Sequence, residues 1–185
     1  MPLKTLVKVG SLTNLSDARY CAGMDVQLIG FQAVPELPAY ISPTRFQEIR
    51  GWISGPAIVA EVHGAQDRHQ IDLIVEGYRP DYIELGLAEL PFAMHSSLPI
   101  ILRIKSDESF SNASLAPAYA LVDFNDSRPF TMPRIVFVTS LEDAENALKA
   151  GGISGIALQG GDELSPGLKT YDTLAPILEM LEDDL

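Results

Sequence analysis

The sequence has little cysteine, few basic side chains and no long hydrophobic run, and each shortage excludes a class of protein. Only Cys21 carries a thiol, so no disulfide can form within the chain, which suits a reducing compartment. The 13 Lys and Arg are outnumbered by 25 Asp and Glu, and the net charge is −12. Because an acidic surface repels phosphate backbones, we expect no nucleic-acid partner.

Membrane insertion and export are also unexpected. No apolar run approaches the roughly 20 residues that cross a bilayer. The segment Met1–Thr5 has neither a long apolar stretch nor a cleavage site, so no signal peptide is predicted. We therefore expect a cytoplasmic protein without a membrane partner.

What the sequence does contain is a regular alternation of apolar, β-rich runs with helical patterns. Apolar residues make up 46% of the 185 residues, enough for a packed core in one domain. Eight runs have strand character: Leu6–Val9, Val26–Phe31, Ala57–Val62, Tyr82–Leu85, Ile100–Ile104, Ala118–Phe124, Arg134–Val138 and Ile156–Leu158. Eight strands alternating with helices favour the α/β class and a (β/α)8 TIM barrel over residues 1–185. The alternative is an open, doubly wound sheet.

The helix signals are uneven along the chain. Helices are predicted to begin at Thr13 or Asn14 and at Ser42-Pro43, and to span Asp67–Glu76, Ser140–Lys149 and Tyr171–Leu181. The segments Glu89–Ser97, Ser106–Pro117 and Asn125–Pro133 are short or rich in Pro, Ser and Asn. Helices around the fourth to sixth strands are therefore expected to be shortened or missing.

Several blocks resemble one enzyme family. Val7–Ala18 reads V-K-V-G-S-L-T-N-L-S-D-A and resembles the first strand and helix of phosphoribosylanthranilate isomerase, roughly V-K-I-C-G-I-T-N-x-E-D-A. The resemblance continues, in the same order, through Ile29–Phe31, Tyr40–Pro43, Leu121–Asp123 and Gly160–Lys169. Members of that family are (β/α)8 barrels, which supports the barrel over the open sheet.

The resemblance implies an intramolecular aldose-ketose (Amadori) isomerase of tryptophan biosynthesis, and the departures from it put that activity in question. The family's general base, a cysteine, falls on Gly10, which has no side chain to take a proton. The arginine that meets the substrate carboxylate falls on Ala39, and the glycine pair after strand seven falls near Thr139-Ser140. Asp123 keeps the general-acid position.

Other positions of the implied site are kept but admit a second interpretation. Lys8, Glu84, Arg103 and Asp123 lie on strands and can point inward. Together they are either a substrate-binding cluster in the barrel mouth or a satisfied charge network, with Asp123 paired to Lys8. Rescue of the lost base through water, by a carboxylate such as Glu61 or Glu84, stays open.

The phosphate site has a similar alternative. Gly160 and Gly161 either offer amides to a phosphate near the short helix that follows, or form only a turn. Thr139-Ser140 is expected to cap a helix.

Few other side chains are candidates for acid–base or nucleophilic chemistry. His63 ends strand three near the mouth, where it is a candidate acid or base, and Ser11 lacks a histidine to activate it. His69 and His95 are expected at the surface, and Cys21 against the barrel wall. No residues have metal-ligand spacing, so no metal or cofactor is expected.

Two hypotheses follow. In the first, a divergent isomerase-like enzyme is impaired in the parent reaction and still binds a phosphorylated small metabolite. In the second, a non-catalytic paralogue acts as a binding or regulatory partner. Either one is a monomer or a homodimer, as the family's members are.

Overall fold

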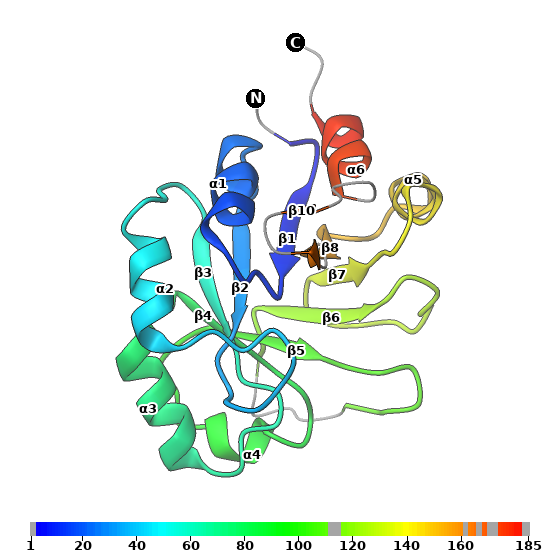
Figure 1. Cartoon of the computed structure of the whole chain (residues 1–185). Helices are drawn as coiled ribbons and strands as arrows, with labels where there is room; N and C mark the ends of the chain where they lie inside the picture. The colour runs from blue at the N-terminus through cyan, green and yellow to red at the C-terminus, as the bar shows by residue number, and fades with distance from the viewer. Residues whose placement is uncertain (1–2, 111–115, 161–162, 166–167, 170–173, 183–185) are drawn as a thin grey trace.

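The chain closes into a ring of parallel strands. A computed structural model describes residues 3–110, 116–160, 163–165, 168–169 and 174–182. Its barrel runs in the order β1 to β8, and β8 pairs back onto β1 (Figure 1). The strands are β1 (Leu6–Gly10), β2 (Leu28–Gln32), β3 (Ala57–Glu61), β4 (Tyr82–Leu85), β5 (Ile100–Arg103), β6 (Tyr119–Asp123), β7 (Arg134–Phe137) and β8 (Gly155–Gln159). The predicted barrel is confirmed, and closure excludes the open sheet.

Helices lie outside the ring, namely α1 (Leu15–Gly23), α2 (Pro43–Arg50), α3 (Arg68–Tyr78), α4 (Leu90–Ala93), α5 (Leu141–Ala150) and α6 (Leu174–Leu181). Of these, α1, α2, α3 and α5 begin where a side chain caps them. The side chains of Asn14, Ser42, Asp67 and Ser140 each accept a hydrogen bond from a first-turn amide. The expected cap at Ser140 is confirmed, and Asn14 rather than Thr13 caps the first helix.

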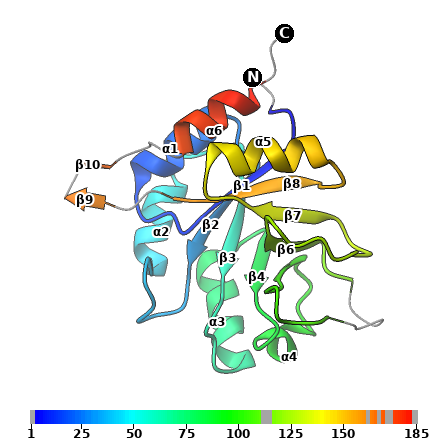
Figure 2. The same cartoon turned by 90° about the vertical axis from the view of Figure 1, so that its right-hand side faces the viewer.

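The barrel is unevenly covered, as the composition predicted. Only the single turn α4 follows β4, and residues 104–110, 116–118 and 124–133 contain no helix (Figures 1 and 2). Phe110, Phe124, Phe130 and Met132 of these loops pack against the core instead. Aromatic loop residues thus replace helices as cover for this side of the barrel.

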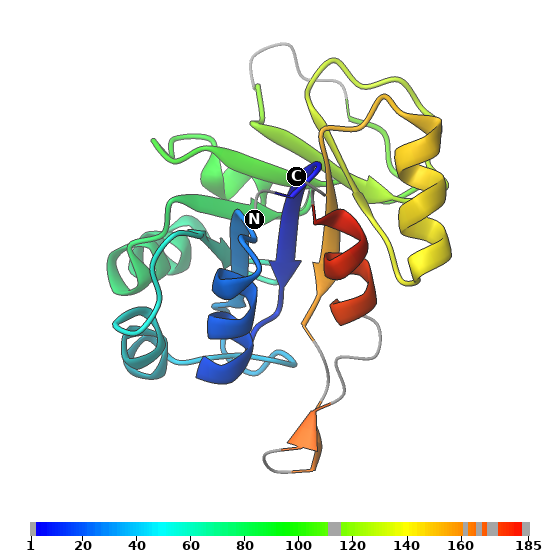
Figure 3. The same cartoon turned by 90° about the horizontal axis from the view of Figure 1, so that it is seen from above.

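Some predicted boundaries are wrong. β2 starts at Leu28, not Val26, because the Val26 amide closes the end of α1 by donating to the Cys21 carbonyl at 3.1 Å. After β8, the described residues form the hairpin β9 (Glu163–Ser165) and β10 (Leu168–Lys169), where a short helix was expected. The turn-forming pair Pro166-Gly167 in the sequence favours the hairpin, which projects from the barrel (Figures 2 and 3).

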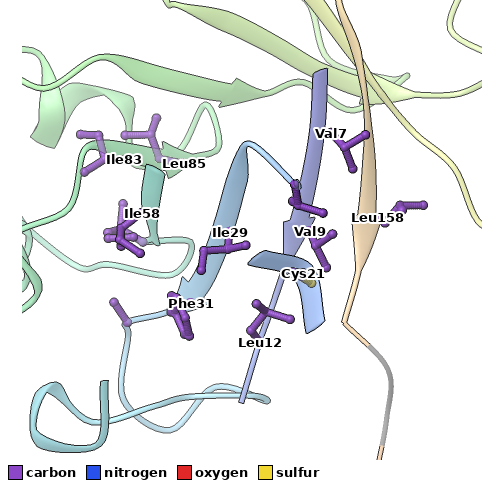
Figure 4. Packing of buried hydrophobic residues seen from close by; sticks show 14 of the residues in the cluster. Val7, Val9, Leu12, Cys21, Ile29, Phe31, Ile58, Ile83, Leu85 and Leu158 are labelled. Carbon is purple, nitrogen blue, oxygen red and sulfur yellow. The ribbon is translucent and has the colours of Figure 1, made fainter. Parts of the chain in front are cut away.

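The period of two along each strand separates an outer layer from the barrel interior. Val7, Val9 and Ile29 belong to the outer layer, where Cys21 of α1 packs near Val9 and Leu12 (Figure 4). Burial raises the pKa of the Cys21 thiol to about 12, so it is an inert part of the wall. The interior is filled by Leu28, Val59, Ile101, Leu121, Ile135 and Ala157.

Candidate functional site

A cavity of about 300 Å³ opens at the carboxyl ends of the barrel strands. Parallel barrels place their active sites at this end, because the loops that follow the strands gather there. Its polar lining includes Lys8, Glu61, His63, Glu84 and Arg103. The structure therefore brings four predicted site residues to one place, namely Lys8, Gly10, Glu84 and Arg103, whereas Asp123 is not among the lining residues.

The floor of the cavity is a buried ion network centred on Lys8. Glu61 and Glu84 are register partners on β3 and β4, so their carboxylates lie side by side. The Lys8 ammonium lies 2.8 Å from Glu61 Oε1 and 2.8 Å from Glu84 Oε2, and each of the three side chains is 6% exposed or less. Glu84 Oε2 is close enough for an ion pair but lacks hydrogen-bond geometry. One cation thus relieves the repulsion between two buried anions.

The network fixes the charge of its members. Burial lowers the pKa of Lys8, but the two carboxylates outweigh this effect and the net pKa is raised. Burial raises the pKa of Glu84, yet Lys8 and His63 hold it below its usual range. Lys8 is therefore a protonated ammonium near neutral pH and cannot act as an amine nucleophile.

Glu61 occupies the space beside Gly10. A Cβ built on Gly10 would lie 2.5 Å from Glu61 Oε1 and 2.7 Å from Lys8 Nζ, closer than real Cβ contacts allow. Gly30, on the neighbouring strand, faces the same Glu61 oxygen. Glycine at both positions is what lets the Glu61 carboxylate reach across β1 and β2.

The same carboxylate shapes the start of the first loop. Ser11 follows Gly10 with a φ of 55°, a left-handed conformation that is uncommon for serine. Its amide donates to both Glu61 oxygens at 3.1 Å, and its hydroxyl donates to Oε2 at 3.1 Å. Ser11 is thus bound as a support of the network and is not poised as a nucleophile.

A second, more open ion pair lies at the rim. Arg103 donates to Asp123 Oδ1, and its guanidinium lies 5.2 Å from the centre of the Phe137 ring. The side chains of Arg103 and Asp123 are 24% and 37% exposed. The predicted partnership of Asp123 with Lys8 is wrong, because Lys8 is taken by the two glutamates one layer deeper.

His63 connects the floor to the solvent. Its Nε2 lies 3.0 Å from Glu84 Oε1, and its side chain is 32% exposed. Burial lowers the pKa of His63, but the hydrogen bond to Glu84 and the charges of Glu84, Glu61 and Glu89 raise it overall. His63 is the group of the mouth best placed to change its proton occupancy near neutral pH. His69 and His95 are exposed, as expected.

The described residues at the positions predicted to bind phosphate make hydrogen bonds within the chain. The Gly160 amide donates to the Gly10 carbonyl at 2.7 Å, and Gly161 lies outside the described residues. At the start of α5, the Asp143 amide donates to Ser140 and the Asp143 carboxylate accepts from Thr139. The phosphate role of the glycine pair stays a prediction.

The remaining predicted positions lie away from the cavity or hold no ligand group. Ala39 is in the loop after β2 with a φ of 63° and does not line the cavity. Within the described residues, no group of three or more His, Cys, Asp or Glu is arranged to hold a metal ion. In that same part of the chain, no helix is long and apolar enough to cross a membrane.

The sequence did not reveal the central place of Glu61. The sequence alone suggests Glu61 only as a carboxylate that could act through water, and it does not indicate the contact with Gly10. A signal was present in the inward parity of three residues: Gly10 and Gly30 leave empty space on adjacent strands, and Glu61 on the next strand has the length to fill it. Two glycines that face the interior on adjacent strands, next to a glutamate on the following strand, therefore indicate the position of the Glu61 carboxylate.

Comparison with known proteins gives a consistent result for the fold. No protein-family model and no curated protein matches the chain. Solved structures do match. TrpF from Jonesia denitrificans gives a TM-score of 0.76 at 15% identity, covering 95% of each chain. A phosphoribosylanthranilate isomerase in complex with reduced 1-(o-carboxyphenylamino)-1-deoxyribulose 5-phosphate gives a TM-score of 0.72 at 17% identity, covering 95% of this chain and 97% of that one.

A third match is an engineered monomeric form of the dimeric isomerase from Thermotoga maritima, with a TM-score of 0.73 at 17% identity, covering 95% and 97% of the two chains. Identities this low establish a shared fold. The fold is the phosphoribosylanthranilate isomerase barrel over nearly the whole chain, as the resemblance predicted.

Proposed function

We propose that this chain, which has the phosphoribosylanthranilate isomerase fold, binds a small metabolite in its mouth and does not catalyse the parent rearrangement at a useful rate. The observation that carries the proposal is the Glu61 carboxylate in the space beside Gly10, where the resemblance places the catalytic thiol. The space of the lost base is therefore occupied by the Glu61 carboxylate, which pairs with Lys8 and accepts hydrogen bonds from Ser11. Since Cys21 is a buried thiol, we expect the protein to act in the cytoplasm.

Glu61 is poorly placed to take over the role of the thiol. Both of its oxygens already accept hydrogen bonds, from Lys8 and from the amide and hydroxyl of Ser11. Taking a proton from a substrate would break these contacts beside a buried ammonium. Losing a general base costs about 10²–10⁴-fold in rate. Ala39 adds to that loss, because it offers no charge to a substrate carboxylate.

A phosphorylated ligand, the second part of the sequence hypothesis, has less support. The one described amide of the glycine pair is engaged with Gly10, and α5 carries Glu142 and Asp143 in its first turn. The charges of these carboxylates oppose an anion at that helix terminus. The described residues favour loss of the parent reaction more than retention of its phosphate site.

Direct turnover of phosphoribosylanthranilate by the purified protein tests the proposal. We expect no turnover above background and no growth of a tryptophan auxotroph that lacks the isomerase. Gly10→Cys combined with Ala39→Arg is expected to stay inactive, because Glu61 and Lys8 obstruct the new thiol. Turnover by the unmodified chain at the rate of an ordinary isomerase would overturn the proposal. Activity in the double variant alone would show that the Glu61 network is no obstacle.

A further inference from the structure

The charges of the mouth differ in sign from what a phosphate ester requires. Lys8 is flanked by Glu61 and Glu84, and Arg103 is paired with Asp123. These two cations face three carboxylates, which leaves one net negative charge when His63 is neutral. Neither cation is without a carboxylate partner, so an incoming anion would have to compete for each.

The rim adds further negative charge. Glu89 accepts hydrogen bonds from the amides of Gly64 and Gly86, at 2.9 and 3.0 Å, and its charge helps to raise the pKa of His63. The whole chain carries a charge of −12, which attracts cations to any cleft. Floor, rim and overall charge therefore act in the same direction.

The mouth also offers an acceptor and an apolar wall within reach of a ligand. Asp123 lies at the edge of the cavity and not in its lining: its Oδ1 accepts from Arg103, which does line the cavity, and its side chain is 37% exposed at the end of β6. Its register partner Phe137 lines the cavity together with Leu121 and Ala157. A cationic head at Asp123 would place an attached ring or chain against this wall.

We infer that the ligand of the mouth is a small organic cation, an amine with an apolar body, whose charged head pairs with Asp123 and whose body packs on Phe137. This inference rests on the proposed binding function and names its ligand class. A site of this kind prefers cations, whereas a site for phosphorylated sugars prefers anions.

Three probes that share one ring separate the possible charges: benzylamine, benzyl alcohol and benzyl phosphate. Their affinities for the purified full chain are measured by isothermal titration or by saturation-transfer NMR at two pH values, one on each side of the His63 transition. Benzylamine is expected to bind at millimolar concentration or better, and benzyl alcohol about tenfold more weakly, since a charge-assisted hydrogen bond is lost. Benzyl phosphate is expected to bind weakest.

The pH dependence of ligand affinity gives a second, independent test of the charge of the ligand. His63 faces Glu84, Glu61 and Glu89, and its imidazolium adds a positive charge to the mouth at low pH. Affinity for benzylamine should therefore rise as His63 loses its proton, whereas an anion would show the opposite trend.

Matched Asp→Asn variants locate the contact. Asp123→Asn should weaken benzylamine binding about tenfold and leave benzyl alcohol unchanged. Asp72→Asn, on an exposed position of α3 away from the mouth, should change neither. Phe137→Leu should weaken all three probes equally.

Tighter binding of benzyl phosphate or benzyl alcohol than of benzylamine would overturn the inference, as would no binding of benzylamine at millimolar concentration. Neither result bears on isomerase turnover, which alone decides the proposed loss of the parent reaction.

Discussion

The mouth of the barrel contains two ion clusters that differ in depth. Lys8, Glu61 and Glu84 are at most 6% exposed; Lys8 pairs with both carboxylates, and Glu61 also accepts from the Ser11 amide. Arg103 and Asp123 are 24% and 37% exposed and lie against Phe137. The deep cluster is complete without a ligand, while the outer pair can exchange its partners for a ligand at little cost. Depth therefore separates the support of the site from its binding surface.

Removing the cation of each cluster is expected to give the largest difference in the free energy of unfolding between the two clusters. Lys8→Met leaves two buried carboxylates side by side without a counter-charge, and we expect a loss of about 3–5 kcal/mol in the free energy of unfolding. Arg103→Met is the matched control, for which the partly exposed pair predicts a loss of about 1 kcal/mol or less. Urea unfolding of both variants measures the difference. Equal losses would show that the two clusters do not differ in kind.

A side chain at Gly10 tests whether the deep cluster fills the space of a lost thiol. Gly10→Cys brings its Cβ against Glu61 Oε1 and Lys8 Nζ, the ends of two long side chains. Because these ends are buried and paired with each other, we expect the overpacking to cost about 1–3 kcal/mol. Gly23→Cys is the control, because a Cβ there meets no atom within 4 Å. Thermal unfolding under reducing conditions compares the two. A Gly10 variant as stable as the control would mean that Glu61 moves aside freely.

The smallest expected effect on stability is that of His63, which contacts the buried Glu84 and is itself partly exposed. Its pKa is raised in the folded state from an ordinary value of 6.5, so its stabilising contribution is full below that pH. The contribution is lost as the pH rises through the folded pKa. The stability difference between the unmodified chain and His63→Gln should therefore shrink as the pH is raised above 6.5. His69→Gln, at an exposed position, should show no such trend.

The fold could be predicted largely because its signals are local. The strands follow from apolar runs, and Ser42-Pro43 and Ser140 mark helix starts by their own capping chemistry. The Pro- and Ser-rich segments foretold the uncovered side of the barrel. The hairpin after β8 differs from the predicted short helix because the local turn pair Pro166-Gly167 favours reversal of the chain.

The site was harder to predict because its contacts join residues far apart in the sequence. The alternation of side chains along a strand predicts that Lys8 and Glu84 point into the barrel, but it does not predict how deeply each one is buried. The alternation alone favours a pair of Lys8 with Asp123 on β6, whereas in the structure Glu61 and Glu84, register partners of each other on β3 and β4, both reach the Lys8 ammonium. The role of Glu61 depends on two glycines on other strands, and only the assembled barrel shows that they meet it.

The placement of the deep cluster has a consequence for synthesis of the chain. All its members lie between β1 and β4, so the ribosome has made every one by the time Leu85 is added. A domain generally folds as a unit. Lys8, Glu61 and Glu84 are synthesised before Arg103 and Asp123 exist, but they therefore stay hydrated until the later strands are made and the ring closes around them.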